Sequence, residues 1–267
     1  LKLRDCIGCE TCMRGLTTGG DGLCVVRDDD MPWFSAAVKE ADALILATPI
    51  YDLIPTGTVV TLLNRVLGIG KEYQTYCRTH PKIGAAMALG GSDWINLTEP
   101  LMDLTVRNLS KGSVIVDKFV VGHNPAPSMV VLDEAVLERA ALLGRRVGEA
   151  LMDREHAGFA GDSGVCPACH CNLLEPRGGA RVGCPYCDAE GTAVIRDGSL
   201  VVEWDADKVR DNRFGPAGDA HHRADIAASH KKAGENRERI RQRVQELEDF
   251  DGVFVQPPKR DPSTTKE

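Results

Sequence analysis

The chain has 267 residues, of which 43% are hydrophobic, so it is long enough to bury the cores of one or two domains. Its 39 Asp and Glu residues exceed its 32 Lys and Arg residues, and the formal charge of −7 disfavours binding to a phosphate backbone. No apolar run approaches the roughly 20 residues of a membrane-spanning helix, and no signal-peptide pattern is present. We therefore expect a cytoplasmic protein that binds neither nucleic acid nor membrane.

The first 153 residues alternate short apolar runs with amphipathic segments. Residues 43–48 are continuously apolar and stop at Pro49, as expected of a strand buried on both faces. The same reasoning predicts strands at 82–89 and 114–121 and helices at 56–67, 97–111 and 133–153. Strands that alternate with helices indicate an α/β layer fold with a parallel sheet.

The pattern changes after residue 153. Small residues at 158–164 form a linker, and Asp197-Gly198 between two apolar runs predicts a β-hairpin. A charged helical segment extends from about residue 220 to 250, and the polar tail from Pro257 is expected to be disordered. We therefore predict three parts: an α/β domain at 1–157, a small metal-binding module at 158–205, and a C-terminal helix with its tail at 206–267.

Nine of the ten cysteines lie in two islands, and only Cys77, which we expect in the interior, stands alone. The first island is Cys6, Cys9, Cys12 and Cys24. Three thiolates at this close spacing can converge on one cluster, and the surrounding glycines allow backbone N–H groups to approach sulfur. With Cys24 as the fourth ligand, the count fits a [4Fe–4S] cluster. A zinc ion, or free thiols without a metal, are the alternatives.

The second island contains two Cys-x2-Cys pairs, Cys166 with Cys169 and Cys184 with Cys187. This is the spacing of a zinc ribbon, in which four thiolates close the coordination shell of Zn²⁺. We expect a structural role, because no open position is left for catalysis. A rubredoxin-like iron site is the alternative from the same ligands.

Three segments together resemble a known family. The first island followed by residues 22–31 resembles the iron–sulfur flavoproteins of the NAD(P)H-dependent FMN reductase superfamily. Residues 47–51, with a helix that ends in Leu63-Asn64-Arg65, and the turn Gly90-Gly91-Ser92 match the same family in the same order. The resemblance covers about residues 1–153 and implies a flavodoxin-like doubly wound sheet that binds FMN, in a homo-oligomer.

The chain departs from the family in two places. The gap between Cys12 and Cys24 is longer than the family's usual gap, so Cys24 matches the family's pattern less closely than the other three ligands. The family also begins with a strand and a loop that binds the FMN phosphate, and neither precedes Leu1. Residues 1–4 are interpreted as the end of the second strand, so we expect a chain truncated at its N-terminus.

The ends of the predicted strands indicate a flavin site independently of the resemblance, because ligands of open α/β sheets bind beyond the carboxyl ends of the strands. Tyr51 and Trp94 can stack on a flat ring, and Gly90-Gly91 brings backbone N–H groups to its polar rim. No side-chain nucleophile or acid–base pair is evident. The predicted flavin contacts are Thr48, Pro49, Ile50, Tyr51, Gly90, Gly91, Ser92 and Trp94.

These patterns predict an FMN-dependent oxidoreductase or electron-transfer flavoprotein. It would pass electrons between NAD(P)H or another donor, FMN and a [4Fe–4S] cluster, with a redox protein as a partner. One alternative is a cluster-free NAD(P)H:FMN or quinone reductase. The other is a non-catalytic interaction module with zinc sites on a flavodoxin-like scaffold.

Overall fold

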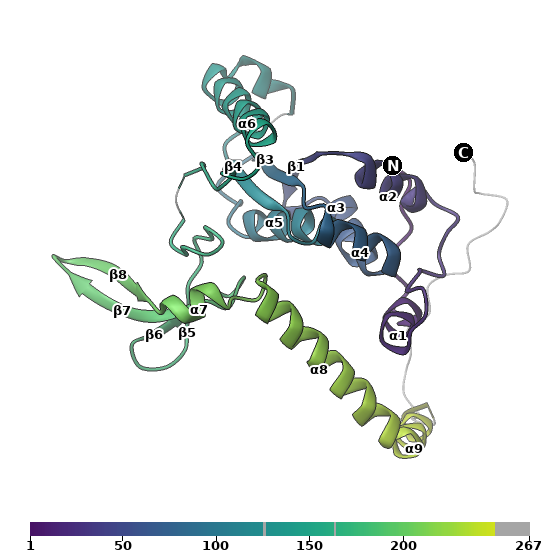
Figure 1. Ribbon diagram of the computed structural model, residues 1–267. Coiled ribbons are helices and arrows are strands. Elements are labelled where there is room, and N and C mark those ends of the chain that lie inside the picture. Colours follow the sequence, from purple (N-terminus) through teal and green to yellow (C-terminus); the bar gives the residue numbers. More distant parts are fainter. Residues whose placement is uncertain (125–126, 163, 249–267) are drawn as a thin grey trace. The chain divides into compact units, whose positions relative to one another are not determined.

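The structure is a computed structural model that describes residues 1–124, 127–162 and 164–248 (Figure 1). These residues fall into two compact units, one over residues 1–222 and the other from residue 223 onward. The disorder predicted for the tail from Pro257 lies outside the described residues. The first unit contains both cysteine islands and the predicted flavin contacts, so it carries the functional questions.

A four-stranded sheet forms the centre of the first unit, in the order β2-β1-β3-β4. The strands β1 (Ala43–Tyr51), β3 (Ile83–Gly90) and β4 (Val114–Val121) are parallel, and the short β2 (Ile54–Pro55) turns back along the end of β1. Ala43 pairs with Ile83 and Ile50 pairs with Gly90, so β1 and β3 end at the same edge of the sheet. This register brings the two predicted flavin segments together.

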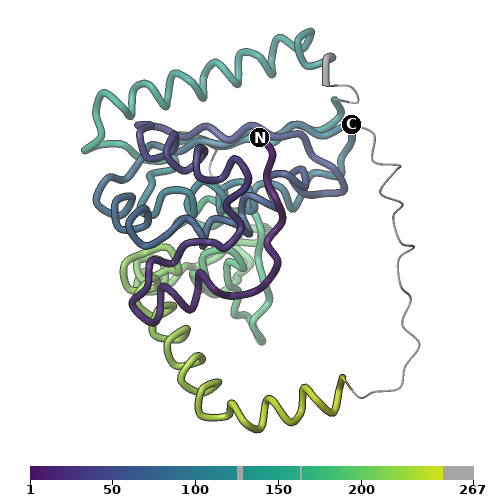
Figure 2. The backbone as a smooth tube through the Cα atoms, turned by 90° about the vertical axis from the view of Figure 1, so that its right-hand side faces the viewer, coloured from purple at the N-terminus to yellow at the C-terminus, as the bar shows by residue number. Residues whose placement is uncertain are grey.

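Helices cover both faces of the sheet. Ile83 and Ala85 of β3 pack against Leu143 and Val147 of α6 (Glu134–Met152), which runs along one face (Figure 2). The alternate residues Ala86 and Ala88 pack against Met102 of α5 (Thr98–Leu109) on the other face. Because side chains alternate along a strand, burial of both faces explains why β3 is continuously apolar in sequence. The prediction that β1 is buried on both faces is wrong, because Ile45, Pro49 and Tyr51 on one of its faces are exposed.

A third group of helices packs beside the sheet. It comprises α1 (Thr11–Thr18), α2 (Met31–Glu40), α3 (Gly57–Arg65) with a 3₁₀ turn at Val66–Gly68, and α4 (Lys71–Thr79). Met31, Leu62 and Tyr73 share one core there with Cys77, which is only 1% exposed. Cys77 thus lies in the interior. Helix α3 begins just after β2 and ends beside the first cysteine island.

A second, antiparallel sheet follows in chain order. Its strands β5 (Glu175–Pro176), β6 (Arg181–Gly183), β7 (Glu190–Arg196) and β8 (Ser199–Trp204) pair in sequence. Asp197 and Gly198 form the β7–β8 turn with φ values of 51° and 77°, so the predicted hairpin is confirmed. The helices α7 (Ala206–Arg210), α8 (Pro216–Glu235) and α9 (Arg237–Glu248) complete the described chain, together with a 3₁₀ helix at Pro127–Leu132.

The predicted α/β fold class is confirmed, and two other local predictions are wrong. Strand β1 does not stop at Pro49 but continues to Tyr51. Proline is tolerated there because it lacks only a donor, and its neighbours still pair with β3. Residues 1–4 are in no strand; Lys2 and Arg4 instead bond through their backbone N–H groups to the carboxylates of Asp30 and Asp29. In the part of the chain that the structure describes, no helix combines the length and apolarity that crossing a membrane requires.

Candidate flavin and metal sites

A cavity of about 750 Å³ lies at the carboxyl ends of β1 and β3. This volume is within the range of about 300–1,000 Å³ of small-molecule sites. Seven of the eight predicted flavin contacts line it: Thr48, Pro49, Ile50, Tyr51, Gly91, Ser92 and Trp94. The eighth, Gly90, is buried at the end of β3, where an added Cβ would lie 2.7 Å from the Ile95 side chain.

The turn after β1 is fixed from within the protein. Asp52 and Leu53 have φ values of 49° and 75°, a conformation that is costly for a branched side chain such as leucine. The buried hydroxyl of Thr98 donates to the Leu53 carbonyl at 2.8 Å. Tyr51 precedes this turn and is 63% exposed, so its ring stands at the cavity with its face available for stacking.

The loop after β3 is supported by the end of β4. The backbone N–H of Asn124 donates to the Gly90 carbonyl at 2.9 Å, and that of His123 to the Ser92 carbonyl at 3.2 Å. Ser92 Oγ in turn accepts from the Trp94 N–H at 3.2 Å. The loop that carries Trp94 is therefore held by three hydrogen bonds, although the indole itself is 59% exposed.

Sequence reasoning missed five other residues of the cavity lining: Ala47, Asp52, Leu89, Asn124 and Val130. Asn124 follows the third parallel strand, so the argument from strand ends that gave Tyr51 and Trp94 also applies to it. The lining holds no Lys or Arg among the described residues. These residues therefore fit the uncharged flavin ring, whereas an FMN phosphate needs donors from elsewhere.

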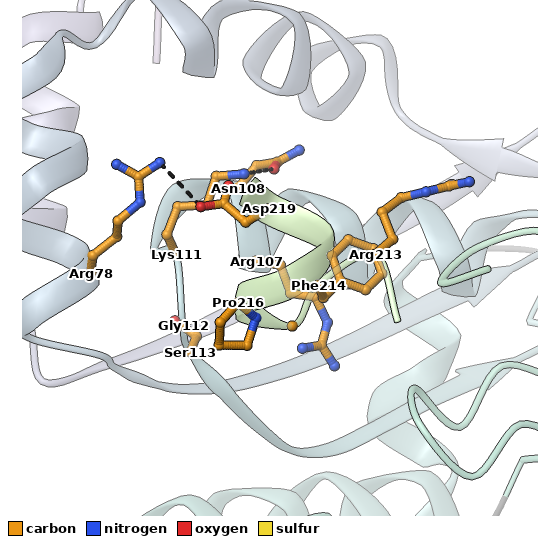
Figure 3. Close-up of a pocket in the computed structure, with 11 residues that line it drawn as sticks. Arg78, Arg107, Asn108, Lys111, Gly112, Ser113, Arg213, Phe214, Pro216 and Asp219 are labelled. Atoms are coloured by element: carbon orange, nitrogen blue, oxygen red, sulfur yellow. Dashed lines mark hydrogen bonds and ion pairs between the residues drawn. The ribbon is translucent and has the colours of Figure 1, made fainter. Parts of the chain in front are cut away.

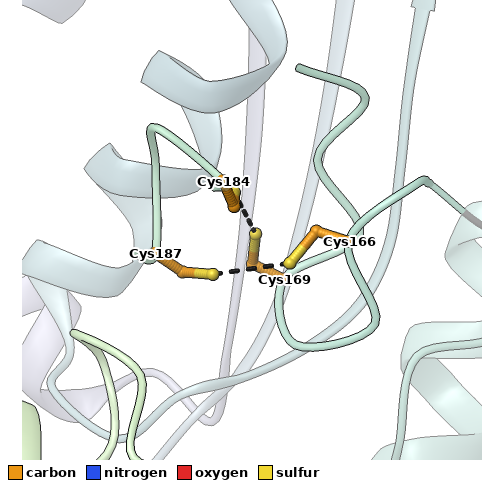
Figure 4. A group of neighbouring side chains, drawn as sticks. All are labelled: Cys166, Cys169, Cys184 and Cys187. Atoms are coloured by element: carbon orange, nitrogen blue, oxygen red, sulfur yellow. Dashed lines mark hydrogen bonds between the residues drawn. The ribbon is translucent and has the colours of Figure 1, made fainter. Parts of the chain in front are cut away.

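The second island brings four sulfur atoms together. All ligand atoms of Cys166, Cys169, Cys184 and Cys187 lie within 4.8 Å of one another (Figure 4). Two sulfur pairs are 3.5 Å apart, which is too long for a disulfide. Zn–S bonds of about 2.3 Å in a tetrahedron place sulfurs ~3.8 Å apart, so the arrangement fits one tetrahedral ion.

Each close sulfur pair combines a thiol of lowered pKa with one of raised pKa. In the first pair, hydrogen bonding from Cys169 lowers the pKa of Cys166 to about 7, and hydrogen bonding with Cys166 raises the pKa of Cys187. In the second pair, Cys166 lowers the pKa of Cys184 and raises that of Cys169. Metal binding requires these thiols to lose their protons, so it would be coupled to proton release.

The α/β sheet contacts this metal site directly. Lys118 of β4 is buried, and its ammonium donates to the Cys169 carbonyl at 2.9 Å and pairs with Glu99 at the same distance. His170 stacks on Phe159 with ring centroids 3.9 Å apart. Arg213 donates to the Tyr186 carbonyl at 3.0 Å, within the Cys184–Cys187 loop. The site is therefore closed on all sides, as structural metal sites are.

The first island is more open. Cys6 and Cys9 are exposed and Cys12 and Cys24 are half-buried. Hydrogen bonds from the side chain and backbone of Thr11, at the start of α1, lower the pKa of Cys9. Burial and the charges of Cys24 and Cys6 raise the pKa of Cys12, so these three thiols lie near one another.

No three of these four sulfurs lie within 4.8 Å of one another in the described structure. That spacing does not form a single-ion zinc site. A four-iron cluster is larger than one ion and separates its cysteine ligands further, so the donor set fits a cluster better than a zinc ion. The buried Nε of Arg65, next to Cys24, also has no hydrogen-bond partner among the described residues.

A separate basic cavity of about 350 Å³ lies at the other edge of the sheet, beside the loop at 111–113 that precedes β4 (Figure 3). Arg78, Arg107, Lys111 and Arg213 contribute to its lining. Two of these cations have acidic partners: Arg78 pairs with Asp219 at 3.7 Å and Arg107 pairs with Asp103 at 2.9 Å. This cavity does not belong to the flavin site.

A parallel α/β sheet with a ring-sized cavity at the carboxyl ends of its strands defines the class of flavodoxin-like proteins. Residues 8–123 match the family described as NADPH-dependent FMN reductase. This match, together with the relatives described next, supports the resemblance to the NAD(P)H-dependent FMN reductase superfamily that the sequence predicted.

Three curated relatives show the same similarity. The chain is 29% identical to flavone synthase cfoJ of Aspergillus candidus over 188 residues, which cover 63% of this chain and 58% of that protein. It is 29% identical over 149 residues to an iron–sulfur flavoprotein of Archaeoglobus fulgidus, covering 56% of this chain and 61% of the relative. An iron–sulfur flavoprotein of Methanocaldococcus jannaschii is 26% identical over 162 residues, covering 56% and 76%.

The chain thus spans about three fifths of the length of the first two relatives. Among solved structures, a flavone reductase superposes with a TM-score of 0.69 at 24% identity, covering 88% of this chain and 85% of that one. At that identity the similarity shows the fold alone.

Proposed function

We propose that this protein is an FMN-dependent oxidoreductase that passes electrons between NAD(P)H or another donor, FMN and a [4Fe–4S] cluster. The flavin ring would lie in the 750 Å³ cavity, and Cys6, Cys9, Cys12 and Cys24 would hold the cluster. The observation that carries the proposal is the convergence of seven predicted flavin contacts on one cavity. A redox protein partner and a homo-oligomer are part of the same proposal.

Helix α3 connects the two redox sites. It begins at Gly57, directly after the turn that borders the flavin cavity, and its nine residues extend about 13 Å at 1.5 Å per residue. Thr61 in its middle donates to the Asp5 carboxylate at 2.8 Å, next to Cys6. When bound, the flavin exchanges electrons in pairs or singly and the cluster carries single electrons, so a short separation supports transfer between them.

The chain's own residues would bind and orient the ring rather than perform acid–base steps. Tyr51 and Trp94 provide aromatic faces, and Gly91 and Ser92 line the cavity, where their backbone N–H groups would bond the polar rim of the ring. The braced turn at Asp52–Leu53 keeps Tyr51 in place without rearrangement on binding.

The second island would bind one Zn²⁺ in a structural role. Four cysteines, each no more than 2% exposed, leave neither an open coordination position nor a path for substrate. Iron in the same four positions is the alternative.

A second candidate function follows from the names of two similar proteins, a flavone synthase and a flavone reductase. A flat, apolar acceptor such as a flavone would suit a cavity with two exposed aromatic side chains. NADPH oxidation measured with a flavone and with a quinone as acceptors separates this candidate from a quinone reductase: only the former predicts turnover that depends on the flavone.

The decisive experiment is anaerobic purification followed by absorption spectroscopy and measurement of flavin, iron and zinc. We expect flavin, about four irons and one zinc per chain. Flavin without iron would refute the cluster and support the cluster-free reductase. Two zinc ions per chain without flavin would support the non-catalytic module.

Two cysteine variants assign the metals. Cys9→Ser should bleach the iron absorbance and leave zinc unchanged, and Cys184→Ser should do the reverse. Loss of zinc in the Cys9 variant would reverse the assignment of the two islands.

A further inference from the structure

Arg65, the last residue of α3, is a buried cation beside the first island. Its side chain is only 1% exposed, as is that of Asp29, whose carboxylate accepts from Arg65 Nη1 at 2.6 Å. The same nitrogen donates to the Arg4 carbonyl at 2.5 Å, and Nη2 donates to the Val26 carbonyl at 2.8 Å. Three of its hydrogen bonds therefore hold the segments that flank the island, from Arg4 before Cys6 to Asp29 after Cys24.

The remaining nitrogen of this side chain, Nε, is buried and has no hydrogen-bond partner among the described residues. Buried polar groups without partners are rare in native proteins, and each needs an explanation. Arg65 and Cys24 line the same cavity of about 250 Å³. Burial would lower the pKa of Arg65, but the hydrogen bond with Asp29 and the charge of Cys24 raise it, so the thiol lies against the guanidinium.

The position of Cys24 is itself fixed by close backbone packing. Its N–H donates to the Gly68 carbonyl at 2.8 Å, and a Cβ on Gly68 would lie 2.6 Å from the Cys24 Cβ. Helix α1 and its following glycine turn, with Gly22 at a φ of 68°, take up the long gap after Cys12. The gap that departs from the family's usual length therefore does not carry Cys24 away from Cys12, whose pKa its charge raises.

We infer that Arg65 is the positioning residue of the first metal site: its free Nε–H donates to the metal-bound Cys24 thiolate, and Asp29 holds it in that orientation. This inference rests on the proposed cluster. Hydrogen bonds to cluster sulfurs and nearby positive charge favour the reduced, more negative state, so they raise the reduction potential. Asp29 also holds the segments on either side of the island in place, because it accepts from the N–H groups of Arg4 and Met31.

The test compares Arg65→Gln, Arg65→Lys and a matched control, Arg27→Gln. The Arg27→Gln substitution removes the same charge. Arg27 also contacts Cys24, through a 3.0 Å hydrogen bond from its Nε to the Cys24 carbonyl, but its side chain is 60% exposed. Each protein is purified anaerobically. The measurements are the reduction potential of the cluster by EPR-monitored titration, the rate of iron loss to a chelator, and the flavin potential and zinc content as internal references.

We expect Arg65→Gln to shift the cluster potential to more negative values and to lose iron several-fold faster than the wild type. Arg65→Lys keeps the charge but lacks Nε–H, so its shift should be smaller. Arg27→Gln should match the wild type because water screens its charge. In all three variants, the zinc content and the flavin potential should not change.

The outcomes separate the inference from the proposed function. A wild-type protein that binds iron, with folded Arg65 variants of unchanged potential and iron retention, overturns the inference and leaves the cluster in place. A wild-type protein without iron overturns both. If Arg65→Gln does not fold, Arg65→Lys decides alone, and an unchanged potential in that variant is sufficient to refute the role.

Discussion

Gly122, at the end of β4, determines the position of the loop that carries the predicted flavin contacts Gly91, Ser92 and Trp94. An added Cβ at this residue would lie 2.6 Å from the Ser92 carbonyl oxygen, whereas real Cβ contacts are not found below 3.0 Å. Gly122→Ala therefore moves that carbonyl by at least 0.4 Å, the difference between 3.0 and 2.6 Å. The carbonyl is backbone and also accepts from the His123 N–H, so the whole loop must shift.

The size of the effect follows from the cost of crowding. Forcing an extra carbon into a packed site costs about 1–3 kcal/mol. The cost falls on the loop conformation that lines the flavin cavity. Since about 1.4 kcal/mol corresponds to a factor of ten, the dissociation constant for FMN should rise about 5- to 150-fold.

Quenching of FMN fluorescence by the purified protein measures this constant. Gly148→Ala in α6 is the matched control, because an added Cβ there meets nothing within 4 Å. Alanine in a helix interior should stabilise the fold by about 0.5–1 kcal/mol and leave FMN binding unchanged. If folded Gly122→Ala protein binds FMN within about two-fold of the wild type, this loop does not set the affinity for flavin.

Three further predictions concern stability, metal and flavin. Asp117, buried on β4, accepts from Arg139 and Arg146; burial alone would raise its pKa, but these bonds lower it. Asp117→Asn should therefore cost about 3 kcal/mol in urea unfolding at pH 7, against nearly nothing for the exposed carboxylate of Asp42. Because the pKa of Asp117 is lowered in the folded protein, its contribution to stability is full above the unfolded value of about 3.9 and is lost as pH falls through the folded value. The stabilities of the wild type and Asp117→Asn should therefore converge in acid. Zinc removal by Cys184→Ser should increase hydrogen exchange across the Cys184–Cys187 loop, and equal protection with and without zinc would contradict a structural role. Tyr51→Leu should weaken FMN binding several-fold while Tyr51→Phe retains it, and equal affinities would show that the ring does not stack on flavin.

Much of the fold could be predicted because its determinants are local. β3 is a continuous apolar run, since helices bury both of its faces, and Asp197-Gly198 specifies a turn by its own backbone preferences. The spacing of Cys184 and Cys187 places both sulfurs on one tight loop. The flavin segments could be paired because parallel strands end at one edge of a sheet. Their roles as flavin and metal ligands stay predictions.

The rest depends on contacts between distant residues. The sequence does not show that Arg65 reaches Asp29 and Arg4, which lie 36 and 61 positions away. For the same reason residues 1–4 were wrongly assigned to a strand: their apolar pattern is short, and aspartate carboxylates rather than a sheet satisfy their N–H groups. The close approach of Gly122 to the Ser92 carbonyl also could not be predicted, because it depends on the register between β3 and β4.

Each cysteine island lies next to a cation buried in the α/β layer, although the chain as a whole is acidic. Arg65 of α3 lies against Cys24, and Lys118 of β4 donates to the Cys169 carbonyl. Thiolate–metal centres carry excess negative charge, and burying that charge is favourable only where cations and hydrogen bonds compensate it. The second island therefore cannot be treated as an independent appendage, because buried Lys118 joins its Cys169 carbonyl to Glu99 of α5. Metal loss at the second island should therefore weaken its attachment to β4, the strand whose end also supports the flavin loop.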